Sequence, residues 1–188
     1  MSDIDNDRNE ILTVHRNWWR ANERWDIPLM KTCFPVGPNY LMFNYNWHPY
    51  FGIEEKVRLW EYYKDSGMTM EPPDVRIMKF EAIGDIAYIA NEFEIRTTMP
   101  AQQSPLIDEV QTLPQPGASM TDRGRSTEIY KRDDGEGHPI WKMWHFHCSP
   151  LPPADALRPG FNDTAESRGG LGSNPWDEPV RSVGAGRA

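Results

Sequence analysis

The stretch Trp141-Lys-Met-Trp-His-Phe-His147 decides how the fold is interpreted, because it has the aromatic-rich composition of a strand. Successive side chains of a strand point to opposite faces of a sheet, so His145 and His147 should share one face. Trp144 and Phe146 should then lie on the other face. Two imidazoles on one wall of a sheet suggest a lined pocket, and the preceding elements determine what that pocket contains.

Three helices are predicted before most of the strands. The first begins at Asp7 in a capping-box-like pattern and continues for about five turns. A second, shorter helix is predicted over residues 27–33, with Asp26 as its cap. A third helix should run from Gly52 to Gly67. The first helix has one apolar stripe at three- and four-residue steps, formed by Ile11, Val14, Trp18, Ala21 and Trp25.

The periodicity then changes from helical to alternating, which predicts a mostly antiparallel meander. Its four strands are expected at residues 74–81, 86–97, 125–132 and 140–148, with hairpin turns at 84–85 and 133–137. An earlier strand is predicted over residues 39–45, followed by a short extended piece over 48–51.

Two segments do not fit a regular element. Residues 99–122 contain four prolines and are too long for a plain hairpin connection, and such loops are often lids or partner contacts. Residues 150–188 are rich in Pro, Gly, Ala and Ser without an apolar period, and are predicted to be a tail. We therefore expect one domain over residues 1–149 and a C-terminal tail.

Composition excludes several classes of protein. The formal net charge is −8 and no Lys/Arg stripe is present, which argues against nucleic acid as a partner. Cys33 and Cys148 are far apart and lack a CxxC pattern, so neither a disulfide framework nor a zinc knuckle is indicated. The acidic start of the sequence does not have the pattern of a signal peptide, and no apolar run is long enough to span a membrane. We expect a soluble, cytoplasmic protein.

The order of helices and strands resembles the nuclear-transport-factor-2-like (NTF2-like) superfamily, in its SnoaL-like and ketosteroid-isomerase-like branch. The resemblance covers residues 8 to about 149, and its strongest segments are 22–34, Phe51-Gly-Ile-Glu-Glu-Lys-Val-Arg-Leu-Trp60 and 134–145. It implies an α+β cone in which three N-terminal helices pack on a curved, mostly antiparallel sheet. It also implies a largely apolar pocket and cofactor-free acid/base chemistry on small, ring-bearing molecules.

Residues 34–52, Phe-Pro-Val-Gly-Pro-Asn-Tyr-Leu-Met-Phe-Asn-Tyr-Asn-Trp-His-Pro-Tyr-Phe-Gly, are most similar to a narrower group. That group is a set of sphingomonad proteins that include the diarylpropane lyase of lignin-dimer catabolism. The similarity implies loss of formaldehyde from a diaryl propanediol through a quinone methide, without a metal or a cofactor.

The isomerase pattern is not complete in this chain. The family's catalytic carboxylate belongs near the end of the first strand, where this sequence has Asn44, Tyr45 and Asn46, none of which is a general base. The family's oxyanion-stabilising acid falls near Thr127 and Glu128, and only Glu128 could take that part. A ketosteroid-type proton shuttle is therefore not expected.

Polar residues in the predicted strands are the candidates for chemistry. Glu92, Glu94 and Arg96 share one face of their strand with Tyr88, and form either an acid/base group in the cone or the solvated back of the sheet. His145 and His147 are candidate general acids or bases, because imidazole titrates near neutrality. The histidine pair also suits a metal with Glu92 or Glu94 as a third ligand, although we expect no metal.

These considerations predict a cofactor-independent lyase acting on a phenolic, lignin-derived diarylpropane dimer. The alternatives are an isomerase, a polyketide cyclase or an epoxide hydrolase of the same fold, or a non-catalytic small-ligand-binding protein. We expect a homodimer or homotrimer. If His145 and His147 face the cone, Trp144 and Phe146 should lie at the subunit contact, and if the strand faces the other way these roles exchange. The predicted catalytic residues are His48, Glu92, Glu94, Arg96 and His145. The predicted substrate-binding residues are Trp18, Tyr40, Asn44, Asn46, Trp60, Tyr88, Arg125 and His147.

Overall fold

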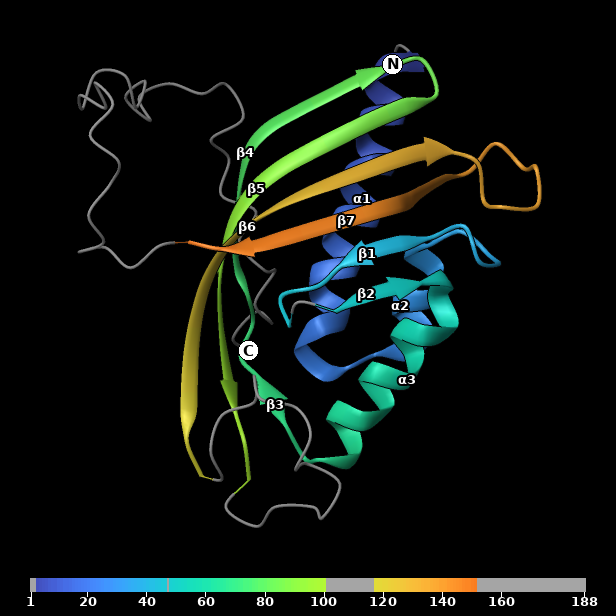
Figure 1. The fold of residues 1–188 in the computed structure, drawn as a ribbon. Helices are drawn as coiled ribbons and strands as arrows, with labels where there is room; N and C mark the ends of the chain where they lie inside the picture. Colours follow the sequence, from blue (N-terminus) through green and yellow to red (C-terminus); the bar gives the residue numbers. More distant parts are fainter. Residues whose placement is uncertain (1–2, 47, 101–116, 152–188) are drawn as a thin grey trace, which may run out of the picture.

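A computed structural model describes residues 3–46, 48–100 and 117–151 of the chain. Helices and strands follow one another in the predicted order, with the long strands at the end (Figure 1). The elements are α1 (Asp3–Arg24), α2 (Ile27–Cys33), β1 (Leu41–Phe43), β2 (Pro49–Phe51), α3 (Gly52–Asp65), β3 (Thr69–Met70), β4 (Asp74–Ile83), β5 (Ile86–Thr98), β6 (Ser119–Arg132) and β7 (Trp141–Pro150).

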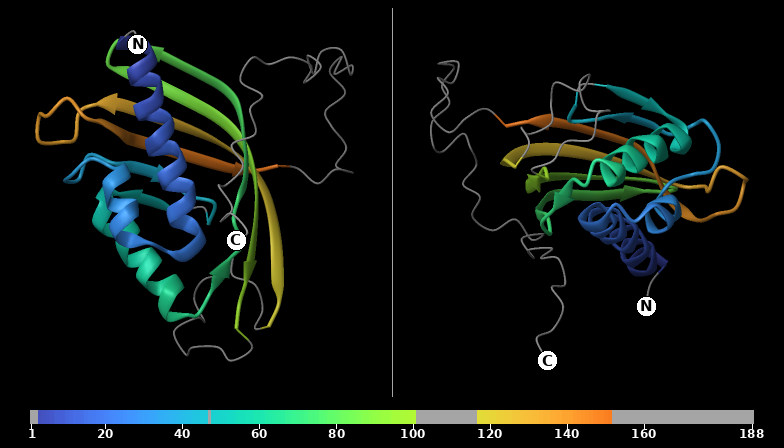
Figure 2. Two further views of the ribbon diagram at one scale, coloured as in Figure 1. Left: turned by 180° about the vertical axis from the view of Figure 1, so that it is seen from behind. Right: turned by 90° about the horizontal axis from the view of Figure 1, so that it is seen from below.

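The strands form one seven-stranded sheet in the order β2-β1-β7-β6-β5-β3, and β4 also pairs with β5. All pairs are antiparallel except β1 with β7, which is parallel. The sheet curves, and α1 lies across its concave side while α2 and α3 close one end (Figure 2). This confirms the predicted α+β cone of three helices on a curved, mostly antiparallel sheet. None of the described helices is both long and apolar enough to cross a membrane.

The start of α1 differs from the prediction. The helix begins at Asp3, one turn earlier than the capping box predicted, and Asp7 lies inside it. The Asp7 carboxylate accepts a hydrogen bond from Trp141 Nε1 at 3.1 Å and forms an ion pair with Arg132. The prediction of a cap at Asp7 is wrong because its carboxylate is used in tertiary contacts with the sheet.

The other two helices follow their predicted local chemistry. Asp26 caps α2, and its Oδ1 accepts from the backbone N–H of Leu29 at 3.0 Å. Gly52 opens α3 with a φ of 71°. A Cβ at that position would lie 3.1 Å from the Pro38 Cα, so both the conformation and the close approach favour glycine.

The predicted meander is present, with longer strands than expected. β6 begins at Ser119, which pairs with Thr98, so the end of the predicted 99–122 loop is part of the sheet. The two-residue strand β3 has no sequence pattern of its own and only extends the edge of β5. The rest of the predicted loop, 101–116, and the tail from 152 onward lie outside the described residues.

The orientation of β7 is decided by a register shift. Ile129 pairs with His145 and Tyr130 pairs with Met143, so Trp144 is an extra residue in the ladder. Met143 is fully buried on the inner face, and after the shift the next inward residue is Phe146. His145 therefore points to the outer face of the sheet.

Trp144 does not share a face with Phe146, contrary to the alternation predicted from the sequence. Its ring lies under Lys131 Nζ at 3.9 Å, on the outer side, and its Nε1 donates to the Asp133 carbonyl at 2.7 Å. Phe146 is 2 % exposed and packs against Trp18 from α1, so the prediction that it lies at a subunit contact is wrong. The prediction fails because simple alternation does not account for a bulge.

Candidate functional site in the interior of the cone

The inner face of the sheet holds a fully buried carboxylate, Glu128. His15 Nδ1 lies 2.6 Å from the Oε2 atom of Glu128, and the Tyr130 hydroxyl donates to the same oxygen. Oε1 accepts from Trp19 Nε1 at 3.0 Å and from Asn91 Nδ2 at 2.8 Å. These four donors come from one helix and two strands, and together they compensate the loss of water around the carboxylate.

Local structure brings these five side chains, the Glu128 cluster, to one place. His15 and Trp19 are one helical turn apart, so they share the face of α1 that meets the sheet. Glu128 and Tyr130 are two residues apart in β6 and share its inner face. Asn91 comes from the neighbouring strand β5, and Ser126 Oγ donates to its Oδ1 at 2.6 Å, which orients the amide NH₂ toward Glu128.

The hydrogen bonds define what the cluster can do chemically. Burial, and then the nearby Glu128 carboxylate, raise the pKa of Tyr130 well above its usual value, so the phenol stays a neutral donor. When Nδ1 donates to Glu128, the His15 imidazole has a lone pair on Nε2. Nε2 is buried and has no hydrogen-bond partner among the described residues. His15 and Glu128 therefore have the arrangement of an imidazole acid/base that is oriented by a carboxylate.

An aromatic region, formed by Trp18, Phe34, Trp60 and Phe146, adjoins this cluster. The Trp18 ring stacks on Trp60 with centroids 5.5 Å apart, and meets the edges of Phe34 and Phe146 at 5.1 and 5.4 Å. Phe146 is the cross-strand partner of Glu128, which makes the two regions continuous. The Nε1 atoms of Trp18 and Trp60 and the hydroxyl of Tyr40 are buried without a hydrogen-bond partner among the described residues.

Two cysteines border the aromatic region but are not nucleophiles. Cys33 and Cys148 are both free and buried. Desolvation by burial raises the pKa of each thiol to about 12. Both side chains are therefore neutral packing groups at physiological pH.

Most of the polar residues predicted for the site lie on the outer face of the sheet. Ile89, Asn91 and Phe93 face inward, so the alternate residues of β5 point outward. There Glu92 pairs with Arg125 at 3.0 Å, Glu94 with Arg123 at 3.4 Å and Arg96 with Glu71 at 3.5 Å. The Tyr88 hydroxyl donates to Glu81 at 2.7 Å.

The two histidines of β7 also lie on this outer face. His145 Nδ1 is 3.0 Å from the Leu41 carbonyl, and burial lowers the pKa of His145. His147 is exposed, and the ring of Phe43 contacts both imidazoles at 5.6 and 5.4 Å between centroids. Neither histidine contacts the Glu128 cluster through any described hydrogen bond or ring contact.

The residues predicted near the end of the first strand form a small polar turn. Asn44 Nδ2 donates to Asn46 Oδ1 at 3.0 Å, and Asn46 Nδ2 donates to the Tyr50 hydroxyl at 2.8 Å. His48 is exposed, and its ring packs against the Tyr50 ring at 4.8 Å. The turn thus fixes Tyr50, which lies at the edge of the aromatic region.

Several interior groups were not among the predicted site residues. His15, Trp19, Asn91 and Tyr130 belong to the Glu128 cluster, and Lys56 is a buried lysine beside the tryptophans. The sequence could have indicated that His15 is buried, because it falls four residues after Ile11 and three before Trp18 in the apolar stripe of the first helix. A polar residue inside an apolar stripe implies a buried partner.

The described residues contain one close group of potential metal ligands, formed by Asp134, Glu136 and His138 in the β6–β7 turn. Asp134 accepts from the backbone N–H of Glu136 and from His138, which lowers the pKa of its carboxyl to about 2. The group therefore has a structural role in the turn. His145 and His147 are separated from Glu92 and Glu94 by the whole width of β6.

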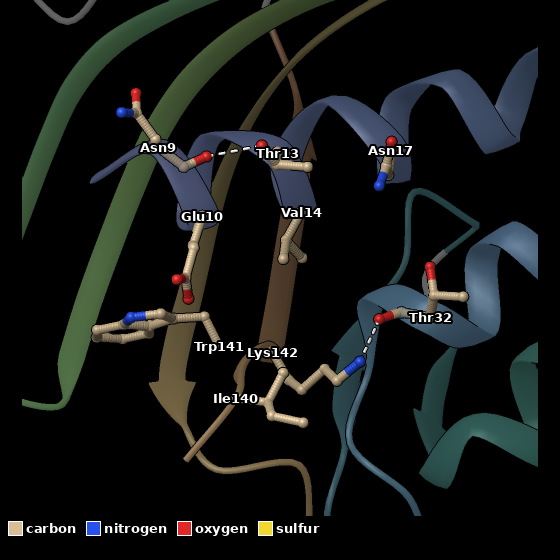
Figure 3. Close-up of a pocket in the computed structure, with 9 residues that line it drawn as sticks. All are labelled: Asn9, Glu10, Thr13, Val14, Asn17, Thr32, Ile140, Trp141 and Lys142. Carbon is tan, nitrogen blue, oxygen red and sulfur yellow. Dashed lines mark hydrogen bonds between the residues drawn. The ribbon is translucent and has the colours of Figure 1, made fainter. Parts of the chain in front are cut away.

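An open groove of about 390 Å³ lies outside the cone, between α1, α2 and the start of β7 (Figure 3). Lys142 crosses it and donates from Nζ to the Thr32 carbonyl at 2.5 Å. The residues that line it are Asn9, Glu10, Thr13, Val14, Asn17, Thr32, Ile140, Trp141 and Lys142. It contains none of the Glu128 cluster, so we place the candidate site in the interior.

No protein-family model matches the chain, and no curated protein matches it. Solved structures do. A ketosteroid isomerase-like protein from Erwinia carotovora atroseptica superposes with a TM-score of 0.58 at 13 % identity, over 77 % of this chain and 96 % of that one. A candidate dehydratase of the NTF2-like family from Streptomyces avermitilis gives 0.57 at 17 % identity, over 79 % and 99 %.

An NTF2-like superfamily protein from Salmonella enterica serovar Typhimurium superposes with a TM-score of 0.60 at 14 % identity, over 84 % of this chain and 99 % of that one. Identities this low establish the fold and leave the reaction to be argued from the site. The chain therefore has the NTF2-like fold.

Proposed function

We propose that the protein is a cofactor-independent lyase that acts on a phenolic diaryl propanediol of the lignin-dimer type and releases water and formaldehyde. The observation that carries the proposal is the buried His15–Glu128 pair, at 2.6 Å, beside an aromatic region built on Trp18 and Trp60. The pair supplies proton transfer, and the aromatic side chains suit a substrate with two rings.

In the first step the substrate loses its benzylic hydroxyl. His15, protonated and held by Glu128, gives its Nε2 proton to the hydroxyl, which leaves as water. The phenolate at the para position supplies the electron pair, and a quinone methide forms. A dry, aromatic environment favours this step because it strengthens the electrostatic effect of each fixed polar group.

In the second step the quinone methide regains its aromatic ring. His15, now neutral, removes the proton of the remaining primary alcohol, and the bond between its carbon and the central carbon breaks. The electron pair of that bond forms the double bond of a stilbene and restores the phenolate, while the alcohol carbon leaves as formaldehyde. One diaryl propanediol thus gives one stilbene, one water and one formaldehyde, and His15 is protonated again.

The residues at the end of β1 favour an elimination over a ketosteroid-type isomerase reaction. One relative is described as a candidate dehydratase, and loss of the benzylic hydroxyl is an elimination of water. A ketosteroid-type shuttle needs a carboxylate near the end of β1, where this chain has Asn44, Tyr45 and Asn46. Neither an amide nor a phenol is an effective base at neutral pH.

We also propose that the protein forms a homodimer or homotrimer through the outer face of the sheet. Phe43 and Phe51 are 43 % and 60 % exposed there, and His145 and His147 flank Phe43. Exposed aromatic side chains on an open sheet favour burial against another sheet. Light scattering should give a dimer or trimer for the wild type and a monomer for Phe43→Asp, whereas a monomeric wild type at micromolar concentration contradicts the proposal.

The function is tested by incubating the purified protein with a panel of phenolic diaryl propanediols and with their para-methoxy analogues. Formaldehyde and the stilbene should appear in equal amounts from the phenols and not from the methoxy compounds, which cannot form the phenolate. Binding of the phenols without any product would indicate a ligand-binding protein. Turnover of the methoxy analogues at the same rate would contradict the quinone-methide route.

A further inference from the structure

Lys56 is a buried lysine in the second turn of α3, and it has no role in the acid/base steps above. Its side chain is 3 % exposed. Nζ lies 5.5 Å from the ring centroid of Trp18, 5.6 Å from that of Tyr50 and 5.8 Å from that of Trp60. Lys56 thus extends from α3 into the aromatic region.

Within the described residues no carboxylate lies where it would compensate the charge of a protonated Lys56. The acidic neighbours on α3 are engaged elsewhere, since Glu54 pairs with Lys31 at 3.0 Å and Glu55 accepts from the backbone N–H of Phe51 at 2.6 Å. A lysine is rarely buried without a paired anion, because the ammonium loses its hydration. The three rings compensate part of that loss by cation–π attraction.

The groups that face Lys56 from the other elements are neutral. Cys148 on β7 is the thiol that interacts with it, and burial raises the pKa of that thiol to about 12. Burial likewise raises the pKa of Tyr50 on β2. Desolvation lowers the pKa of Lys56 itself to about 7, so near neutral pH the amine can both accept and hold a proton.

We propose that Lys56 is the recognition site for the substrate's phenol, taking its proton and holding the resulting phenolate as the anion that this region lacks. The proposal rests on the function proposed above and names the part of the substrate that the aromatic region recognises. The buried, unpartnered Tyr40 hydroxyl and Trp60 Nε1 are polar atoms in the same region that a bound phenolate oxygen could also satisfy.

The proton balance of this step is simple. The neutral amine of Lys56 accepts the phenol proton and becomes an ammonium ion, and the phenol becomes a phenolate, so no proton is exchanged with solvent. After the stilbene forms, the ammonium ion returns the proton to the product phenolate. Lys56 therefore starts and ends each cycle as a neutral amine.

The test uses 4-hydroxyacetophenone, whose phenolate absorbs at longer wavelength than the neutral phenol, at pH 7 where the free probe is mainly neutral. Bound to the wild type, the probe should show the phenolate band. In Lys56→Met the dissociation constant should rise at least tenfold and the bound probe should stay neutral. Lys64→Met removes an exposed lysine from the last turn of the same helix and should behave as the wild type.

4-Methoxyacetophenone is the matched probe that cannot ionise, and it should bind the wild type and Lys56→Met equally. A neutral spectrum for the probe bound to the wild type, no binding to the wild type, or a phenolate band retained in Lys56→Met would each overturn the proposal. These outcomes are separable from the lyase test. Formaldehyde release without a phenolate band would refute the role of Lys56 alone, and a phenolate band without formaldehyde release would refute the reaction alone.

Discussion

His15 Nδ1 and Glu128 Oε2 lie 2.6 Å apart, although 113 residues separate them in the sequence. Both side chains are fully buried, so the contact joins α1 to the centre of the sheet without solvent. A carboxylate that fixes one imidazole nitrogen leaves the other available for proton transfer.

Glu128→Gln keeps the shape of the side chain but removes its charge and replaces one acceptor with a donor. We expect turnover to fall by about 100-fold or more, because the oriented acid/base loses its carboxylate. The free energy of unfolding should fall by about 1–3 kcal/mol, because buried donors lose their acceptor. Steady-state kinetics and urea unfolding measure the two effects.

Tyr130→Phe is the control within the same cluster. It removes one of the donors to Glu128, so we expect a loss of about 1 kcal/mol in stability. Turnover should stay within about tenfold of the wild type, since the His15–Glu128 contact is retained. A Glu128→Gln variant that turns over as fast as Tyr130→Phe would contradict the assigned role of the carboxylate.

The outer histidines should be dispensable for the chemistry. In His145→Ala and His147→Ala we expect turnover per folded protein to remain within a few-fold, because neither side chain faces the interior. Any change should appear in the oligomeric state, which light scattering measures alongside kinetics. Loss of turnover with an unchanged oligomeric state would contradict this prediction and would support the catalytic role that the sequence suggested for His145 and His147.

Lys56→Met should stabilise the protein in a pH-dependent way. The pKa of Lys56 is about 7 in the folded state and about 10.4 in an unfolded chain, so the unfolded state binds more protons between these values. The free energy of unfolding of the wild type therefore rises with pH in that window. The amount by which that of Lys56→Met exceeds it becomes smaller. Between pH 6.5 and 8.5 we expect the difference to fall by roughly 2 kcal/mol. A pH-independent difference would contradict the lowered pKa.

Asp7→Ala should loosen the attachment of α1 to the sheet without changing the chemistry. The carboxylate binds Trp141 Nε1 and Arg132, and Arg132 also pairs with Asp85 at 2.9 Å. Because Arg132 is partly exposed, we expect a loss of about 1 kcal/mol, measured by thermal unfolding. A large loss of turnover at unchanged stability would mean that Asp7 acts on the site.

Much of the fold could be predicted because the local patterns are strong. The cap at Asp26, the glycine that opens α3 and the alternation of the long strands all appear in the structure where the sequence indicated them. The register shift at Trp144 could not be predicted, since one extra residue reverses the facing of a strand without changing its composition.

The interior site was harder to predict than the fold. Its members come from α1, α3, β5, β6 and β7, and only the curvature of the sheet around the helices brings them together. The charged residues of β5 suggested a catalytic role for that strand, but a polar strand face is equally typical of a solvated surface. A single histidine in an apolar helix stripe, His15, was the most informative position, because burial requires a partner.

The most direct test compares formaldehyde release from a phenolic diaryl propanediol by the wild type, His15→Gln and His145→Gln. Circular dichroism and thermal unfolding should first establish that all three proteins are folded. If His15→Gln does not fold, Glu128→Gln replaces it in the comparison. We expect equal release by the wild type and His145→Gln, and a loss of about 100-fold or more in His15→Gln. Release by His15→Gln at the wild-type rate, or no release by the wild type, would contradict this expectation.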